Sequence, residues 1–120
     1  MLITAYNSRD TDETVTLRDA NRNPITLAVG DKIRVKVGRS SNETPLLDIV
    51  SGSPLSGGTQ INAVNPATLK LYKADLAIAN IKPGIYDCEV SVVDSADSSR
   101  IKHAESAIFQ VIGTQLGGVN

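Results

Sequence analysis

The chain has 120 residues, of which 41% are hydrophobic and 21% charged, and its formal net charge at pH 7 is -1. This composition is typical of a globular domain and differs from that of disordered or membrane-spanning chains. A net charge so close to zero gives no general attraction to nucleic acid or to an anionic bilayer. We therefore expect one folded domain over residues 1–120, with neither nucleic acid nor a membrane as its partner.

Cysteine usage and the N-terminal sequence indicate a cytoplasmic route of synthesis. Cys88 is the only cysteine, so it cannot form an internal disulfide, which fits a reducing compartment. No basic segment followed by a long apolar run opens the chain, so no secretory signal is expected. The sequon Asn-Glu-Thr at Asn42 is therefore interpreted as a loop tripeptide rather than a glycosylation site.

Alternation of apolar and polar residues with a period of two dominates the first half of the chain and predicts β-strands. It places Val15 and Leu17 on one face of residues 14–19, and the Asp, Asn and Pro of residues 19–24 then predict a turn. Residues 32–37 are the clearest strand. Their inward face carries Ile33, Val35 and Val37, and their outward face Lys32, Arg34 and Lys36. Shorter strands are predicted within residues 45–51 and 59–64.

Residues 66–80 fit either a helix or a strand. Asn65 could cap a helix with Pro66 at its first position, and apolar residues recur at helical spacing through this segment. Leu69 and Leu71 also alternate with Lys70, as in a strand. We favour a strand over about 67–72, followed by a single helical turn over about 74–79.

The segment PGIYDCEVSVVD, residues 83–94, reads as one strand, with Tyr86, Cys88 and two valines on the same face. A Tyr-x-Cys step of this kind resembles the strand of immunoglobulin domains that carries the second disulfide cysteine. With no second cysteine and no tryptophan in the chain, Cys88 is predicted to act as a small buried apolar residue. Tyr86 is predicted to form a tyrosine corner, with its hydroxyl bonded to backbone within residues 79–82.

The last predicted strand covers residues 100–113. Phe109 and Val111 fit a core face, while His103 and Glu105 interrupt the pattern and indicate a bulge or a rim position. Ile108 and Ile112 point the opposite way. Short strands separated by turns predict an all-β, immunoglobulin-like antiparallel β-sandwich. We expect about seven or eight strands and one short helical turn, with a short N-terminal arm and a Gly-rich C-terminal tail.

Candidate chemistry is sparse. His103 is the only histidine and Cys88 is predicted to face the core, so no catalytic, cofactor or metal site is expected. Four acidic residues could meet at one end of the sandwich and bind calcium, but no Asp-x-Asp-x-Asp-Gly ladder is present, so solvated loops are the preferred interpretation. They are Asp12, Glu13, Asp94 and Asp97. The outward Lys32, Arg34 and Lys36 lack the aromatic neighbours that a nucleic-acid surface needs, so a solvated or subunit-facing sheet face is expected.

The stretch from residue 61 to 97 resembles small immunoglobulin-like modules of bacteriophage virion proteins, of the tail or baseplate accessory and head decoration type. Its Pro-Gly-x-Tyr step leads into an alternating strand, a polar hairpin and a final strand that ends on an aromatic residue and a valine. These residues are Pro83, Gly84, Tyr86, residues 94–99, Phe109 and Val111. The resemblance covers about residues 14–112. It implies a non-enzymatic structural protein of the virion, made in the host cytoplasm, that assembles in or decorates the tail, baseplate, neck or capsid without a cofactor.

Two other functions stay open: an adhesion module that binds a host surface or glycan, and an enzyme. Under the virion hypothesis the partners are other virion proteins and further copies of the chain, in a homo-oligomer or larger assembly. The termini are the expected contacts, because the Gly-rich tail has little apolar surface to anchor it, and either it or residues 1–6 could lie along another chain. The candidate assembly contacts are Leu2, Ile3, Ile108, Ile112 and Leu116.

Overall fold

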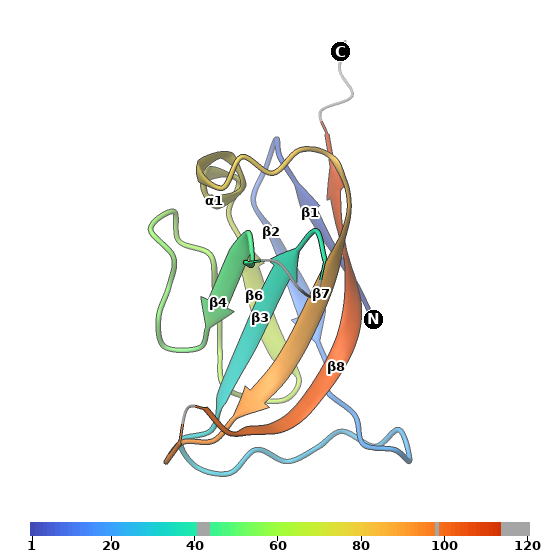
Figure 1. Ribbon diagram of the computed structural model, residues 1–120, viewed down its shortest axis with the longest axis vertical. Coiled ribbons are helices and arrows are strands. Elements are labelled where there is room, and N and C mark those ends of the chain that lie inside the picture. The colour runs from blue at the N-terminus through green and yellow to red at the C-terminus, as the bar shows by residue number, and fades with distance from the viewer. Residues whose placement is uncertain (41–43, 98, 114–120) are drawn as a thin grey trace.

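The computed structural model describes residues 1–40, 44–97 and 99–113, which form a β-sandwich with one short helix (Figure 1). The elements in chain order are β1 (Leu2–Tyr6), β2 (Thr11–Val15), β3 (Lys32–Gly38), β4 (Leu47–Val50), β5 (Gln60–Ile61), β6 (Ala67–Leu71), α1 (Lys73–Ile78), β7 (Gly84–Val93) and β8 (Ile101–Ile112). The helix α1 lies at one end of the sandwich and the long connection between β2 and β3 at the other. No helix within the described ranges is long and apolar enough to cross a membrane.

The strands form two sheets with the topology of an immunoglobulin-like sandwich. One sheet has the order β1-β8-β7-β3-β4 and the other the order β2-β6-β5. All neighbouring strands are antiparallel except β1 and β8, which are parallel. The three-stranded sheet corresponds to strands B, E and D of that fold, and β8, β7, β3 and β4 correspond to G, F, C and the extra strand of variable-type domains. The expected fold class is confirmed.

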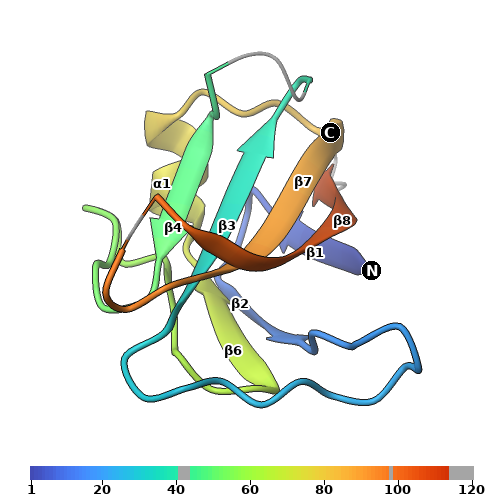
Figure 2. The same cartoon turned by 60° about the horizontal axis from the view of Figure 1, so that its bottom comes forward.

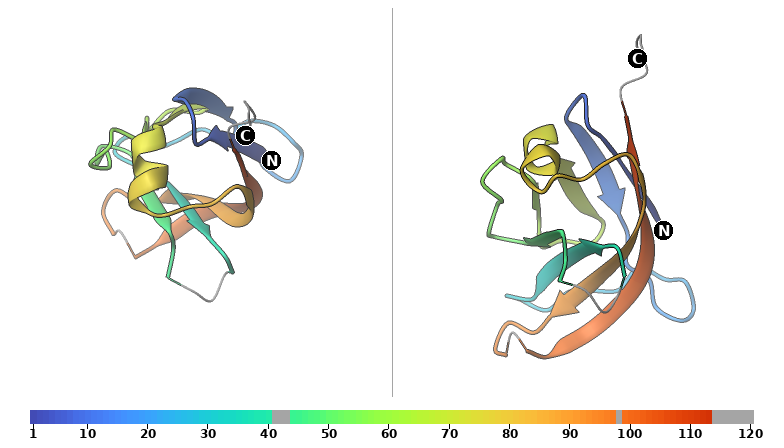
Figure 3. Two further views of the ribbon diagram at one scale, coloured as in Figure 1. Left: turned by 90° about the horizontal axis from the view of Figure 1, so that it is seen from above. Right: turned by 45° about the horizontal axis from the view of Figure 1, so that its top comes forward.

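The core lies between the two sheets, which form two layers when the molecule is seen from above (Figure 3). Alternate residues of each strand point into it, as the period of two requires. Its largest fully buried side chains are Phe109, Ile3, Leu17, Ile33, Ile49, Leu69, Leu71, Val15, Val35, Val37, Val90 and Val92. The inward faces predicted for residues 14–19, 32–37 and 86–92 are therefore confirmed, although β2 begins at Thr11 and ends at Val15.

The ambiguous segment folds as the favoured interpretation predicts, with strand β6 followed by the six-residue helix α1. Asn65 does not cap a helix. Its side chain instead accepts a hydrogen bond from Leu17 N–H at 2.9 Å and donates to the carbonyls of Leu17 and Ile25 at 2.9 and 2.8 Å. It thereby ties the long β2–β3 connection to the start of β6.

A buried carboxylate anchors the helix to the loop that precedes β5. Asp75 is only 3% exposed, and its two oxygens accept hydrogen bonds from the backbone N–H groups of Gly57 and Thr59, each at 2.8 Å. A Cβ on Gly57 would lie 2.6 Å from one of these oxygens, so only glycine fits this contact. The polar loop and the helical turn are therefore held as one unit.

The N-terminal segment belongs to the domain's own sheet, which corrects one expectation. Strand β1 runs parallel to β8, with Leu2 paired with Ile108 and Tyr6 with Ile112. Ile3 is 1% exposed and packs in the core, so its side chain is not available as an assembly contact. The interpretation of residues 1–6 as an arm on another chain is wrong, because they form a strand of the domain's own sheet with Ile3 and Ala5 in its core, while Leu2 faces outward.

Strand β8 carries the irregularity that its sequence predicts. The register with β7 shifts between Val92, which pairs with His103, and Val93, which pairs with Ile101. Lys102 is thus the extra residue of a β-bulge, and bulges increase the local twist of a strand pair. In Figure 2 the first half of β8, which contains the bulge, crosses in front of the sheet above the connection formed by residues 16–31.

Candidate interaction surface

The Tyr-x-Cys step has structural roles. The hydroxyl of Tyr86 donates to the carbonyl of Lys82 at 2.6 Å, which is the predicted tyrosine-corner bond. Cys88 is 6% exposed, and burial raises the pKa of its thiol to about 12. A thiol in that state is neutral near pH 7 and therefore a poor nucleophile. The predicted burial of Cys88 is confirmed.

The acidic residues that could have formed a calcium site are not brought together. Asp94 and Asp97 accept hydrogen bonds from Ala96 N–H at 2.8 Å and Ser99 N–H at 3.0 Å within their own hairpin. Glu13 accepts one from Thr4 N–H at 2.9 Å, where the two sheets meet. Within the described residues, no group of three or more His, Cys, Asp or Glu side chains could hold a metal ion.

The face of the five-stranded sheet that points away from the core, here called the outer face, carries an exposed apolar cluster at one corner. Leu2, Ile85 and Ile108 are 57, 71 and 49% exposed. Leu2 pairs directly with Ile108, and Ile85 lies diagonally across from Ile108, because its own partner is Gln110. Strand neighbours in these positions are close enough for their side chains to touch. The three residues therefore form one continuous apolar surface.

Apart from Met1, which precedes Leu2 and is 42% exposed, the other exposed large apolar side chains among the described residues are dispersed. Val29 and Val64 lie in loops, Ile78 ends α1, and Ile101 begins β8. Single exposed apolar residues are common on soluble proteins, whereas contiguous ones mark binding surfaces. This contrast makes the outer face the strongest candidate site.

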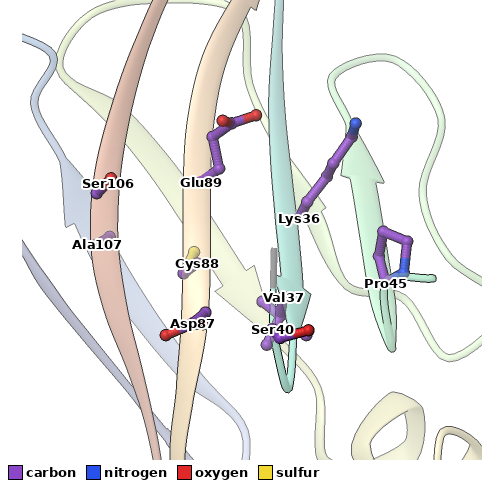
Figure 4. Close-up of a pocket in the computed structure, with 10 residues that line it drawn as sticks. Lys36, Val37, Ser40, Pro45, Asp87, Cys88, Glu89, Ser106 and Ala107 are labelled. Carbon is purple, nitrogen blue, oxygen red and sulfur yellow. The ribbon is translucent and has the colours of Figure 1, made fainter. Parts of the chain in front are cut away.

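A hollow of about 420 Å³ lies beside the apolar cluster on β3, β7 and β8 (Figure 4). Its lining residues are Lys36, Val37, Gly38, Ser40, Pro45, Asp87, Cys88, Glu89, Ser106 and Ala107. Gly38 and Ser106 keep the sheet surface low, while Pro45 in the β3–β4 connection stands beside it. Lys36 is directly opposite Glu89 in the β3–β7 register. The hollow thus combines a small apolar surface with charges of both signs.

Some of the charged side chains around the hollow already have an ion-pair partner within the chain, and others do not. Arg34 binds both carboxylate oxygens of Asp48, at 2.8 and 2.6 Å, and this interaction lowers the pKa of Asp48. Within the described residues, neither Lys36 nor Glu89 has an ion pair within 4 Å. The predicted basic stripe therefore contains a neutralised arginine, whereas Lys36 lies between Asp48 and Glu89 on the neighbouring strands without a close ion pair to either.

Of the candidate assembly contacts, Leu2 and Ile108 lie together on the outer face and Ile112 is half-buried at the end of β8. Leu116 lies outside the described residues, so its role stays a prediction. Sequence reasoning missed Ile85. Its outward direction could have been predicted from the sequence. Tyr86 and Cys88 point inward, and side chains alternate along a strand, so Ile85 must point outward.

Two solved structures are similar to this chain over most of its length. A chain from parallel homodimer structures of the extracellular domains of the voltage-gated sodium channel beta4 subunit, described as explaining its role in cell-cell adhesion, is 12% identical. The alignment covers 95% of this chain and 92% of that chain, with a TM-score of 0.44. A chain from photo-crosslinking analyses of multimeric cell-adhesive interactions of VGSC beta subunits is 15% identical, with 95 and 91% covered and a TM-score of 0.43.

Similarity at this level carries no argument about what this chain does. Both chains come from work on sodium channel subunits, so neither adds support to a bacteriophage origin. No protein-family model matches this chain, and neither does any curated protein. The functional argument therefore rests on the residues of the outer face.

Proposed function

We propose that this chain is a non-enzymatic, immunoglobulin-like interaction module that binds a second copy of itself through the outer face. The continuous apolar surface of Leu2, Ile85 and Ile108 carries this proposal. Burial of a leucine or isoleucine that is half exposed contributes about 1 kcal/mol. Three such side chains, buried together, provide a centre around which a weak but specific interface can form.

The charge pattern favours a second copy as the occupant. Lys36 and the acidic pair Asp87 and Glu89 lie on adjacent strands, so the outer face carries both signs side by side. A two-fold rotation brings the same surface patch of two subunits together. Lys36 of one subunit can then approach an acidic residue of the other, while the apolar clusters bury one another. An exclusively acidic or basic face could not pair with itself in this way.

The test is the concentration dependence of the oligomeric state. Sedimentation velocity should show a monomer–dimer equilibrium for the native chain. Ile108→Lys should shift it toward monomer, because a lysine in an apolar contact leaves a desolvated charge. Loss of one central contact costs about 1–2 kcal/mol, which is about a five- to thirtyfold weaker dimer.

Ile78→Lys is the matched control, because Ile78 is 68% exposed on α1, away from the outer face. It should leave the equilibrium unchanged. Circular dichroism must show that both variants are folded. A native chain that stays monomeric at millimolar concentration, or equal effects of the two substitutions, would contradict the proposal.

The more specific proposal places this self-association in the assembly of a virion, with other virion proteins as further partners and synthesis in the host cytoplasm. Its support is the sequence resemblance carried by Pro83, Gly84 and Tyr86 and by Phe109 with Val111. Quantitative mass spectrometry of purified particles tests it. A copy number that matches tail or capsid symmetry supports assembly, whereas absence of the chain from particles refutes it.

The alternative function is adhesion to another cell or host surface. Binding between two outer faces supports adhesion as well as it supports virion assembly, provided that the two copies lie on apposed surfaces. Recognition of a glycan is the weaker form of this alternative, because three tyrosines and one phenylalanine supply few rings for stacking on sugars. Aggregation of beads coated with the chain tests the self-adhesive form. Beads that carry Ile108→Lys should stay dispersed if the outer face mediates it.

A further inference from the structure

One long stretch of sheet edge is left open. Strand β8 pairs with β7 from Ile101 to Val111, but β1 covers its other side only from Ile108 to Ile112. Among the residues that the structure describes, no strand therefore covers residues 101–107 on that side. The other sheet edges are less open. The edge strands β4 and β5 are short, with four and two residues. The edge strands β1 and β2 face one another, and Thr4 N–H of β1 donates to the side chain of Glu13 on β2.

The open stretch presents unpaired main-chain groups. Ile108 N–H donates to the carbonyl of Met1 at 3.0 Å, and the carbonyl of Ile112 accepts from Asn7 N–H at 3.1 Å. Even-numbered residues of β8 therefore direct their N–H and C=O groups toward the β1 side, since this direction alternates along a strand. Ala104 and Ser106 share this parity. A row of such groups is a template for another strand.

One usual protection of an open edge, a free lysine, is missing here, while the bulge at Lys102 is retained. A lysine on an edge keeps other strands away when its ammonium group stands free. The ammonium group of Lys102 instead lies 2.9 Å from a carboxylate oxygen of the buried Asp31. A second loop contact along the edge is the bond from Arg18 N–H to the side chain of Glu105 at 2.8 Å, which uses no main-chain group of β8.

We propose that residues 101–107 of β8 pair antiparallel with the same residues of a second copy, so that two five-stranded sheets become continuous. The sequence favours one register. When Ala104 faces Ala104 of the other copy across the two-fold axis, His103 faces Glu105 in both directions. A facing imidazole and carboxylate can share a hydrogen bond, and they carry opposite charges when the imidazole is protonated, whereas two facing carboxylates repel each other.

Neighbouring registers are worse. A two-fold axis at Glu105 would set two glutamates opposite each other, and one at His103 would set two histidines opposite each other. Within one copy, His103 Nε2 already lies 2.8 Å from Glu105 Oε2, so the two groups can exchange this partner for the matching one across the edge. The edge interface is separate from the outer face, and the two together would connect copies into a larger assembly.

Disulfide trapping tests both the contact and its register. In a Cys88→Ala background, Ala104→Cys places the two thiols in directly facing positions, within the range that a disulfide spans. Mild oxidation should then give a crosslinked dimer at least about tenfold faster than for Ile78→Cys, because strand pairing raises the effective concentration of the thiols. Ile78 serves as the control because it is exposed and lies on α1.

Ser106→Cys is the register control. Ser106 faces Lys102 of the second copy, so two Ser106 positions are four residues apart, or about 13 Å along the paired strands. This variant should crosslink no faster than Ile78→Cys. Rapid crosslinking of Ser106→Cys, or none of Ala104→Cys beyond the control rate, would overturn the proposal.

A charge test gives a second readout that is independent of cysteine. His103→Glu sets like charges opposite each other and should abolish edge dimerisation, while His103→Lys should retain it. Thermal unfolding of both variants verifies that they are folded. Equal dimerisation of the two would contradict the register. Failure of the edge contact would leave the outer-face proposal intact, because Ile108→Lys tests that face separately.

Discussion

Replacing Tyr86 with phenylalanine removes one hydrogen bond and leaves the ring in place. The lost bond joins the start of β7 to the carbonyl of Lys82, four residues earlier, at 2.6 Å. It therefore holds the connection between α1 and β7 in its corner conformation. A protein hydrogen bond contributes about 0.5–1.5 kcal/mol net. Tyr86 is half-buried, so water can reach the freed carbonyl, and we expect a loss of about 0.5–1 kcal/mol.

This loss is large enough to measure in a thermal scan. An unfolding entropy of about 2.1 cal/mol/K per residue gives about 0.25 kcal/mol/K for a chain of this length, so the melting temperature should fall by about 2–4 °C. Circular dichroism of native protein and Tyr86→Phe measures the difference. Tyr72→Phe is the control, since no hydrogen bond is described for the Tyr72 hydroxyl. An unchanged melting temperature for Tyr86→Phe, or an equal fall in the control, would refute the role of the corner.

Three further predictions concern buried and paired groups. Native Cys88 should react only slowly with a maleimide at pH 8, because its pKa is raised to about 12, and rapid labelling would contradict its burial. Asp75→Ala should lower the free energy of unfolding by about 2–4 kcal/mol in urea titrations, since the buried N–H groups of Gly57 and Thr59 lose their acceptor. The folded pKa of Asp48 is lowered below its ordinary value of 3.8, so its stabilising effect is present above that value and is lost as the pH falls through the folded pKa. Native protein should therefore exceed Asp48→Asn in stability by about 0.5 kcal/mol at pH 7, after solvent screening of this exposed pair. That difference should shrink toward pH 2, and a constant difference would contradict the pairing.

The elements that the sequence predicted well are those whose pattern is local. Residues 32–37 alternate without interruption, and both faces of β3 follow directly from that period. The Tyr86–Cys88 step predicted the corner because the bonded carbonyl lies only four residues away. The strand and helical turn between residues 67 and 79 could also be separated, because the alternation ends at Leu71.

Features that depend on distant parts of the chain could not be read in this way. Strand β1 offers only Ile3 and Ala5 as inward residues, and its partner β8 lies about a hundred positions later in the sequence. Its apolar residues therefore resembled an unattached arm. The hollow similarly requires small residues at Gly38 and Ser106, on strands that the fold brings to the two sides of β7.

The candidate site was only half visible for a related reason. Ile108 was recognised because it opposes the core face of its own strand, but Ile85 becomes significant only through the register that sets it beside Ile108. The pairing of Arg34 with Asp48 likewise depends on the neighbouring strand β4. Strand register, rather than the pattern of any one strand, determines which exposed residues form a common surface.

The central claim is that the outer face binds a second copy, and an NMR titration of protein concentration tests it most directly. Amide chemical shifts recorded from about 10 μM to 1 mM cover the range in which an interface of this size should form. We predict concentration-dependent shifts at Leu2, Ile85 and Ile108 and around the hollow at Lys36 and Glu89, all of them lost in Ile108→Lys. Spectra that do not change on the outer face over this range would contradict the claim.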